Sequence, residues 1–381
     1  MKLGVGVVGC GNISEIYLHN ARLFRDFGVV ACADINPEAA RRQAERHRVA
    51  GCSVTDLLKR EDVDIVLNLT LPEAHAGVSL AALEAGKHVY SEKPLATTVE
   101  DGRRILAAAE ALGLRVGAAP DTVLGAGYQA ARRAVDSGAI GRPLSALAVI
   151  MSHGMEHWHP NPGFFFREGA GPVFDMGPYY ISALVHLLGP VFWVQATARS
   201  GFAARTVSTP GSSVLGETIP VETPTSVHAL LEFASGAQAA FLASWDVWRH
   251  SLPPIELHGE TASLSLPDPN WFGGRVRIAE GRANWRTLRS GGGAPFARAN
   301  WPTDAPRAEN NRGLGLADMA RAILDRRSHR ANGEVALHVL AVMTGILDSA
   351  EQGTKLRVSV SCERPAPLSA KEAQSLLTRV A

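Results

Sequence analysis

Three side chains with charge and acid–base chemistry stand at positions that suggest a reaction. Lys93 directly follows a short apolar strand pattern, and Asp175 and Tyr179 lie four residues apart in a helical pattern, so they share one helix face. Oxidation of a secondary alcohol needs a hydride acceptor, a base for the hydroxyl proton and a cation near the developing alkoxide. We predict Tyr179 as the acid/base, Lys93 as its cationic partner and substrate anchor, and Asp175 as an orienting hydroxyl acceptor. A free tyrosine has a pKa of about 10, and a nearby ammonium would favour its phenolate.

A glycine turn near the N-terminus has the spacing of a dinucleotide-binding turn. Residues 9–14, Gly-Cys-Gly-Asn-Ile-Ser, lie between the first strand pattern and the first helical pattern, and Asp34 ends the next strand pattern 20 residues after Ser14. The first glycine of such a turn makes the tight bend, the second lets the backbone approach a pyrophosphate, and the helix start supplies N–H donors. A glycine turn without a ligand is the alternative. We expect a dinucleotide to contact Gly9, Gly11, Asn12 and Ile13.

Asp34 favours NAD over NADP as the cofactor. A carboxylate at this place accepts a hydrogen bond from the ribose 2′-hydroxyl and would repel a 2′-phosphate. Arg41 and Arg42 follow one to two helical turns further on, so some use of NADP stays open.

A loop rich in histidine follows a predicted strand in the middle of the chain. Residues 153–159 contain three histidines, but their spacing matches no zinc signature and no cysteine is near, so we expect no metal. Trp158 would offer an apolar face to a sugar ring, and His157 and His159 would offer partners to its hydroxyls. A loop that merely packs beside the cofactor is the alternative. Asp121, at the end of the last strand of the first domain, is a further candidate for contacting substrate.

Two kinds of pattern divide the chain. Residues 1–122 alternate strands with helices of 10–15 residues, which predicts an α/β domain with a doubly wound parallel (Rossmann) sheet. Residues 123–381 include the alternating segments 226–233 and 237–245 around a Ser-Gly turn, which predict an antiparallel hairpin. We expect this second part to be an α+β domain with a large, mostly antiparallel open sheet that binds substrate and mediates oligomerisation. The segment 267–311 is rich in Gly, Pro, Ser, Thr and Asn, and we expect it to form a long loop.

Composition narrows the class of protein. The chain has 381 residues, with 38 Lys and Arg against 37 Asp and Glu, and this balance argues against a nucleic-acid binder. No segment approaches the ~18 uninterrupted apolar residues of a membrane span, and the N-terminal apolar run lacks signal-peptide features. Four cysteines without CxxC spacing fit a reducing compartment. We therefore expect a cytoplasmic protein with no membrane or nucleic-acid partner.

Further motifs resemble a known family. Residues 64–98 contain Thr70-x-Pro72-x-x-His75, then Ala-Gly-Lys-His-Val at 85–89, then Glu92-Lys93-Pro94. Together with residues 9–14 this pattern resembles the Gfo/Idh/MocA family of sugar and cyclitol oxidoreductases. Residues 171–179 resemble the family's active-site helix, where a tyrosine four residues after the aspartate is typical of the glucose–fructose oxidoreductase branch. The resemblance implies that five further residues line the cofactor site: Thr70, Pro72, His75, Glu92 and Lys93.

The leading hypothesis is an NAD-dependent dehydrogenase that transfers a hydride between the nicotinamide and a secondary hydroxyl or keto group of a sugar, glycoside or cyclitol. A glycosidase- or epimerase-type enzyme, which oxidises a sugar carbon transiently, is one alternative. A non-catalytic NAD and sugar sensor on the same fold is another. A broad antiparallel sheet usually leaves one face to cover, and the resemblance points the same way, so we expect a homodimer or homotetramer.

Overall fold

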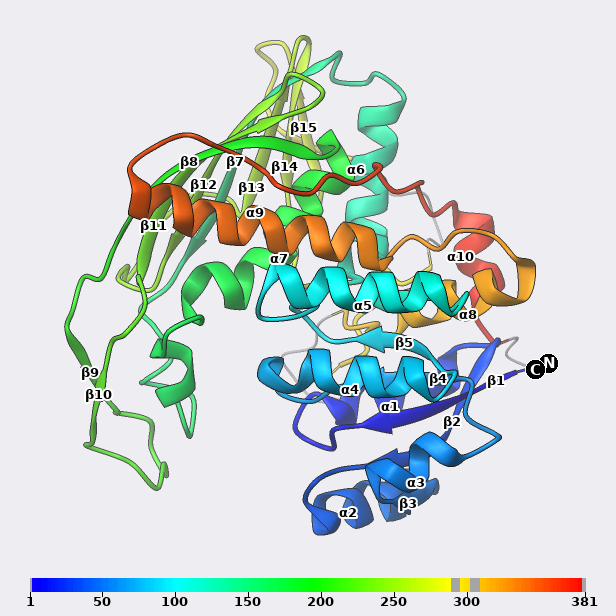
Figure 1. The fold of residues 1–381 in the computed structure, drawn as a ribbon. Coiled ribbons are helices and arrows are strands. Elements are labelled where there is room, and N and C mark those ends of the chain that lie inside the picture. Colours follow the sequence, from blue (N-terminus) through cyan, green and yellow to red (C-terminus); the bar gives the residue numbers. More distant parts are fainter. Residues whose placement is uncertain (1, 289–294, 302–308, 379–381) are drawn as a thin grey trace.

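The chain folds around two large β-sheets, and a small two-stranded sheet stands apart from them (Figure 1). The structure, a computed structural model, describes residues 2–288, 295–301 and 309–378. The first sheet comes from the N-terminal third of the chain, and the second, larger sheet comes from the rest. The predicted fold class is confirmed.

The first sheet is parallel and has the strand order β3-β2-β1-β4-β5-β6. The order reverses between β1 and β4, and the carboxyl ends of the strands at such a switch point form the crevice where ligands bind. Its strands are β1 (Leu3–Val8), β2 (Phe27–Ala33), β3 (Ala50–Cys52), β4 (Ile65–Asn68), β5 (His88–Ser91) and β6 (Val116–Ala118). The short strand β3 and the helix after it have no clear periodic pattern, and sequence reasoning missed both.

The connections of this sheet carry its helices, and some of these helices begin at a residue whose side chain caps them. The side chain of Asn36 accepts a hydrogen bond from the N–H of Glu38, and that of Thr98 from the N–H of Asp101, so each satisfies a free helix-start donor. The helices are α1 (Ser14–Asn20), η1 (Ala21–Leu23), α2 (Pro37–His47), α3 (Val54–Lys59), α4 (Pro72–Glu84) and α5 (Val99–Ala111).

The second sheet has nine strands in the order β16-β15-β14-β13-β7-β12-β11-β8-β17. Among the strands of the described residues, only β12 and β7 pair in parallel, so the sheet is mostly antiparallel, and the hairpin predicted over 226–245 is present as β11 and β12. The strands are β7 (Pro143–Met151), β8 (Val191–Arg199), β11 (Ser226–Phe233), β12 (Gln238–Ser244), β13 (Ile255–Gly259), β14 (Ala262–Leu266), β15 (Arg277–Glu280), β16 (Arg286–Thr287) and β17 (Leu356–Arg357). Two short strands, β15 and β16, thus lie in the first half of the expected 267–311 loop.

Helices cover one face of this sheet (Figure 1). They are α6 (Ala126–Asp136), α7 (Gly171–Leu188) and α9 (Gly333–Gln352). Within the described part of the chain, α9 is the one helix long and apolar enough to cross a membrane by length and composition. It packs against β8, α7 and α5, and Leu340, Val342 and Ile346 on it are fully buried.

The C-terminal segments return to the first sheet. The N–H of Ala118 at the end of β6 donates to the carbonyl of Ala331, and the N–H of Thr378 donates to the carbonyl of Leu23. These contacts place α8 (Leu314–Asp325) and α10 (Ala370–Leu376) beside the parallel sheet. The two parts of the chain therefore share elements, and a domain division at residue 122 stays a prediction.

A separate lobe projects from the edge of the second sheet (Figure 1). The ribbon of β9 (Ala204–Thr206) and β10 (Thr218–Pro220) packs against residues 152–170, which include η3 (Gly163–Phe166). We call this lobe the arm. A buried arginine, Arg205, joins its layers through ion pairs to Glu156 and Asp246.

Candidate active site

The glycine turn has the geometry that a bound pyrophosphate requires. Gly9 has a φ of 101°, and a Cβ there would lie 2.5 Å from the backbone of Leu69, so only glycine fits. Gly11 has open space on the side where a Cβ would stand. Ser14 is buried, and its hydroxyl donates to the carbonyl of Gly11 at 2.6 Å, which stiffens the turn. Asn12 is exposed and Ile13 half-buried, both at the mouth of the turn.

Asp34 is fixed beside this turn. Its carboxylate accepts hydrogen bonds from the N–H of Cys10 at 2.7 Å and the N–H of Asn36 at 2.8 Å. A pocket of about 630 Å³ opens next to it, between α2 and the β3–α3 segment. Arg41 in this pocket is paired with Glu38 and Glu45. Its charge is thus balanced within α2, which disfavours recruitment of a 2′-phosphate.

His75 braces the loops that carry the family-like motifs. Its Nδ1 lies 2.6 Å from the carbonyl oxygen of Pro94, and its Nε2 lies 3.0 Å from the carbonyl oxygen of Thr70. The ring is buried, and burial lowers its pKa. Pro72 begins α4. His75 therefore ties the loop after β4 to the loop after β5, which carries Lys93.

Lys93, in the loop after β5, contacts Asp175 on α7. Lys93 Nζ donates to the backbone carbonyl oxygen of Asp175 at 2.6 Å and to its Oδ1 at 3.0 Å. Burial alone would lower the pKa of Lys93, but attraction to Asp175, Tyr179 and Glu92 outweighs burial and raises it. The ammonium therefore stays charged at the carboxyl edge of the parallel sheet.

Tyr179 lies one helical turn further along α7 and is buried, with an exposed fraction of 6%. Lys93 Nζ lies 5.4 Å from the centroid of its ring. The hydrogen-bond partner of its hydroxyl is another residue, Arg312, whose Nη2 donates to Tyr179 Oη at 3.1 Å. The structure thus brings together the three predicted catalytic residues and adds an arginine that sequence reasoning missed. No periodic pattern marks Arg312, which follows the long segment 267–311.

Glu92 connects this cluster to the dinucleotide turn. Its Oε2 accepts from the N–H of Lys93 at 2.9 Å, and its Oε1 accepts from the hydroxyl of Tyr17 at 2.7 Å. Tyr17 lies on α1, the helix that follows the glycine turn, and burial raises its pKa well above the ordinary value. Glu92 thus positions the backbone of Lys93 relative to the turn.

Asp121 is buried beside the start of α8. Its carboxyl group is buried, and Oδ2 accepts hydrogen bonds from the N–H groups of Gly313 at 3.0 Å and Gly315 at 2.8 Å. Burial raises its pKa to about 6. The group holds the start of α8, directly beside Arg312, and its expected contact with substrate stays a prediction.

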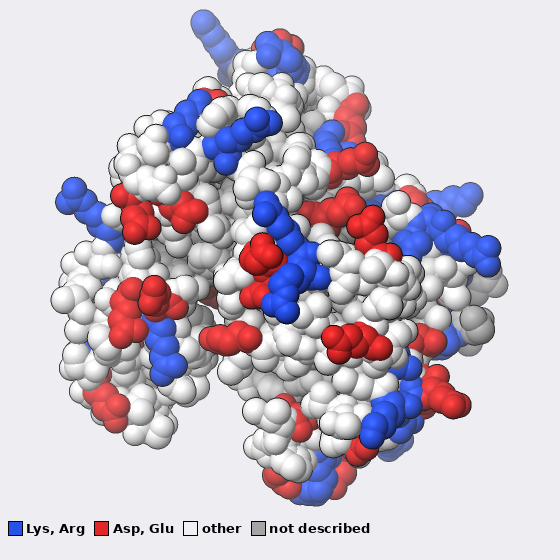
Figure 2. Space-filling view, in the orientation of Figure 1, with Lys and Arg blue, Asp and Glu red and all other residues white. Residues whose placement is uncertain are grey.

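The histidine-rich loop belongs to the arm. Trp158 is 55% exposed, and His157 is exposed as well. His159 packs edge-on against the rings of Trp158, Phe164 and Phe165, and its carbonyl oxygen accepts from the hydroxyl of Thr209 at 2.9 Å. Figure 2 shows the surface hollowed between the arm and the N-terminal domain, with both signs of charge interspersed around it.

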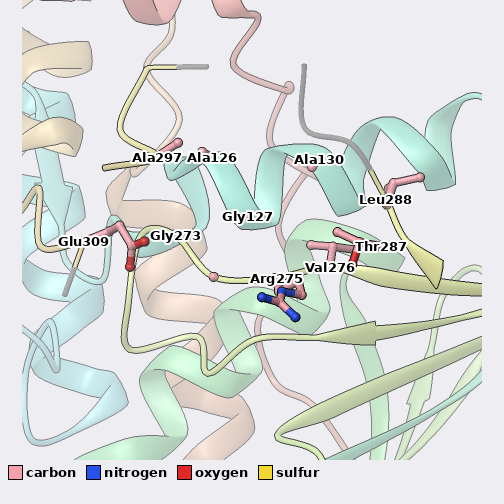
Figure 3. Close-up of a pocket in the computed structure, with 11 residues that line it drawn as sticks. Ala126, Gly127, Ala130, Gly273, Arg275, Val276, Thr287, Leu288, Ala297 and Glu309 are labelled. Carbon is pink, nitrogen blue, oxygen red and sulfur yellow. The ribbon is translucent and has the colours of Figure 1, made fainter. Parts of the chain in front are cut away.

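Metal ligands and one further pocket are other possible parts of a site. Within the described ranges, no group of three His, Cys, Asp or Glu side chains could hold a metal ion. A pocket of about 390 Å³ lies between α6 and residues 273–276 and is lined by Arg275 and Glu309 among small residues (Figure 3). It contains none of the predicted site residues.

These features define the class of protein. A doubly wound parallel sheet carries an open glycine turn with an aspartate beside it, and a lysine, an aspartate and a tyrosine gather near its carboxyl edge. This is the arrangement of an NAD-dependent oxidoreductase acting on a CH–OH group.

The chain belongs to the Gfo/Idh/MocA family. Residues 3–119 match the family model described as "Oxidoreductase family, NAD-binding Rossmann fold", and residues 128–265 match the "GFO/IDH/MocA C-terminal domain". The resemblance noted from the motifs is thereby confirmed.

Individual proteins match this chain over most of its length. Levoglucosan dehydrogenase of Pseudarthrobacter phenanthrenivorans is 26% identical over 294 residues, covering 72% of this chain and 74% of that protein. Inositol 2-dehydrogenase of Ralstonia nicotianae is 29% identical over 278 residues, covering 71% and 75%. The solved structure "Levoglucosan dehydrogenase, complex with NADH" superposes with a TM-score of 0.79 at 22% identity, over 94% of this chain and 100% of that one, which shows a shared fold.

Proposed function

We propose that this protein oxidises a secondary hydroxyl of a sugar, glycoside or cyclitol, or reduces the corresponding ketone, with NAD(H). The observation that carries the proposal is the contact of Lys93 with Asp175 one helical turn from Tyr179. The names of the relatives, which are dehydrogenases of an anhydrosugar and of inositol, support this substrate class.

The chemistry divides among the residues of this cluster. A bound nicotinamide would supply the hydride acceptor, held at the Gly9–Gly11 turn. The ammonium of Lys93 would steady the substrate oxygen as negative charge develops on it, and the Asp175 carboxylate would accept a hydrogen bond from the substrate. Tyr179 Oη would take the hydroxyl proton.

The arm would supply the outer wall of the substrate site. Trp158 and His157 are exposed on it, and a sugar ring stacked on the indole would leave its hydroxyls free for imidazole partners. The hollow in Figure 2 supports this placement. His159, packed among aromatic rings, would shape the wall through its backbone.

The uncovered face of the second sheet would form a homodimer interface. Leu230 is 61% exposed, and the strand register places it beside Ala240 on β12 and, across that strand, beside Leu147 on β7. Leu242 follows on the same face, so an apolar patch lies on several neighbouring strands. The four cysteines are free, which supports a reducing, cytoplasmic setting.

The deciding experiment is a substrate panel. Thermal shifts with NAD present would first identify sugars and cyclitols that bind, and NADH absorbance would then measure net oxidation, with Tyr179→Phe as the inactive control. Net NADH formation that depends on Tyr179 is the expected result. Turnover of a glycoside without net NADH would contradict the proposal and favour transient oxidation, and binding without any turnover would favour a sensor.

A further inference from the structure

Arg312 is a buried cation without a carboxylate partner. Its exposed fraction is 7%, and among the described residues no Asp or Glu oxygen forms an ion pair with its guanidinium. Its side-chain hydrogen bonds go to Asn310 Oδ1 at 2.8 Å, Asn270 Oδ1 at 2.8 Å and Tyr179 Oη at 3.1 Å. All three acceptors are formally neutral, and a buried charge is costly unless it is paired.

The other buried arginines of the described chain are paired. Arg205 contacts Glu156 and Asp246, Arg330 contacts Asp318, and Arg132 contacts Asp136. Arg312 therefore departs from the way this fold treats its buried guanidinium groups. This unpaired guanidinium contacts the hydroxyl of Tyr179, the residue proposed as the base.

The other charged groups near Tyr179 form their hydrogen bonds with partners other than its hydroxyl. Lys93 from the loop after β5 is bonded twice to Asp175 on α7 and lies over the tyrosine ring, away from hydrogen-bond contact with the hydroxyl. Glu92 accepts from Tyr17 on α1 and from the N–H of Lys93. Burial would lower the pKa of Arg312, but attraction to Tyr179, Glu92 and Tyr17 outweighs it and raises the pKa. Of the three atoms that accept a hydrogen bond from the Arg312 side chain, only Tyr179 Oη becomes negatively charged when it loses its proton.

We propose that Arg312 is a positioning residue that holds Tyr179 Oη by hydrogen bond and stabilises its phenolate, so that Tyr179 is the proton acceptor and Lys93 with Asp175 is left to hold the substrate oxygen. The inference deepens the proposed function and rests on it. In the oxidation, the hydroxyl proton of the substrate moves to Tyr179 Oη, the hydride leaves the same carbon for NAD, and a ketone, a phenol and NADH result. Arg312 keeps its own protons throughout.

Ionisation of tyrosine tests this assignment without any substrate. The chain has five tyrosines, and burial raises the pKa of Tyr17, Tyr90, Tyr128 and Tyr180. The ionisation signal of Tyr179 can therefore be followed separately from those of the other four tyrosines. It is measured by ultraviolet difference spectroscopy on the whole protein and assigned by its loss in Tyr179→Phe.

The variants separate charge from structure. Arg312→Gln should move the tyrosinate titration, and the rising limb of kcat/KM with pH, to higher pH by roughly 1–3 units, the range for loss of an opposite charge at contact distance. Arg312→Lys keeps a positive charge, so both curves of this variant should lie close to those of wild type. The matched control is Arg321→Gln on α8, whose guanidinium pairs with Asp325 at the surface and whose loss should leave both curves in place.

Three results would overturn the inference. The first is a wild-type protein in which no Tyr179-dependent tyrosinate forms below the pKa of free tyrosine. This result needs no Arg312 variant, so it overturns the inference even if Arg312→Gln misfolds. Coincident titrations of wild type and Arg312→Gln do so as well. An Arg312→Gln that raises KM only for carboxylated sugars, with an unchanged pH limb, would make Arg312 a substrate-anion site instead.

The two proposals fail separately. An Arg312-dependent titration of Tyr179 in a protein that oxidises no sugar or cyclitol would refute the proposed function and leave the Arg312–Tyr179 coupling standing. Dehydrogenase activity with a titration that ignores Arg312 would refute the coupling alone.

Discussion

Lys93 Nζ lies 2.6 Å from the backbone carbonyl oxygen and 3.0 Å from Oδ1 of Asp175, although 82 positions separate the two residues. One residue comes from the loop after β5 of the parallel sheet, and the other from the second turn of α7 in the second domain. The contact therefore links the two domains at the same point where it sets the charge of the site. A change at either residue should therefore alter both the packing of α7 against the loop after β5 and the chemistry of the site.

Loss of Lys93 should show both effects. In Lys93→Ala the site loses the charge that steadies the developing alkoxide, so kcat should fall by ~10²–10⁴, at least as far as for a lost acid/base. The bonds to Asp175 also disappear, which should lower the melting temperature. Asp175→Asn keeps an acceptor for Lys93 and should cost less in both measurements. Steady-state kinetics and thermal unfolding of the two variants side by side check this order, and a more severe loss in Asp175→Asn would contradict it.

Tyr179→Phe should separate chemistry from fold. The ring and its packing remain, so the melting temperature and NAD affinity should stay near wild type, while kcat falls by ~10²–10⁴ because the proton acceptor is gone. Combined with Lys93→Ala, the loss should be less than additive, since the two groups act in one step. Retention of more than about half of the wild-type kcat would make Lys93 or His157 the better candidate for the base.

Cofactor choice should depend on Asp34. NAD(H) should bind at least tenfold tighter than NADP(H), a difference of ~1.4 kcal/mol, because the carboxylate repels a 2′-phosphate. Asp34→Asn should narrow the gap. Glu38→Gln together with Glu45→Gln should narrow it further by releasing Arg41 from its ion pairs. Fluorescence titration with both cofactors measures this, and equal wild-type affinities would refute the role of Asp34.

Local patterns predicted the parts of the site that lie within single elements. The glycine turn, Asp34, Lys93 and the pair on α7 each have a signal inside one strand, turn or helix, and the structure brings Lys93, Asp175 and Tyr179 together. Alternation likewise predicted the β11–β12 hairpin. These signals depend on periods of two or 3.6 residues, which a sequence displays directly.

Contacts between distant elements had no such signal. Arg312 reaches Tyr179 from 133 positions away, after a segment without periodicity, and Asp121 meets Gly315 from 194 positions away. The end of a strand suggested a substrate contact for Asp121, but the docking of α8, which no local pattern specifies, gives its carboxylate two N–H donors. The short strand β3 has three residues, too few to show alternation.

Leu230→Arg should disrupt assembly. Leu230 is exposed on the uncovered sheet face, beside Ala240 in the strand register, and a charge there cannot be buried against a second copy without a partner. Light scattering should give a dimer or larger for wild type and a smaller particle for the variant. The control, Leu112→Arg, changes an exposed leucine just beyond α5 and should leave the mass unchanged. A wild-type monomer at micromolar concentration would refute the interface.

The buried carboxyl group of Asp121 should give stability a specific dependence on pH. Its pKa rises from 3.8 to about 6 because it is buried, even though Gly315 donates to it. Between about pH 4 and pH 6 the folded protein therefore holds a proton that the unfolded chain has lost, so this group's contribution to the free energy of unfolding falls as the pH rises through that window. The difference corresponds to about 3 kcal/mol.

Asp121→Asn isolates this contribution. The amide oxygen can still accept from the N–H groups of Gly313 and Gly315, but the side chain carries no charge at any pH. Denaturant unfolding from pH 4 to pH 7.5 should show wild type losing up to about 3 kcal/mol relative to the variant as the pH rises to about 6, with little relative change above it. Asp325→Asn, which changes a surface partner of Arg321, should run parallel to wild type through this window. Parallel curves for wild type and Asp121→Asn would mean that Asp121 is already ionised when the protein folds at pH 4, and that its hydrogen bonds to the start of α8 outweigh the cost of its burial.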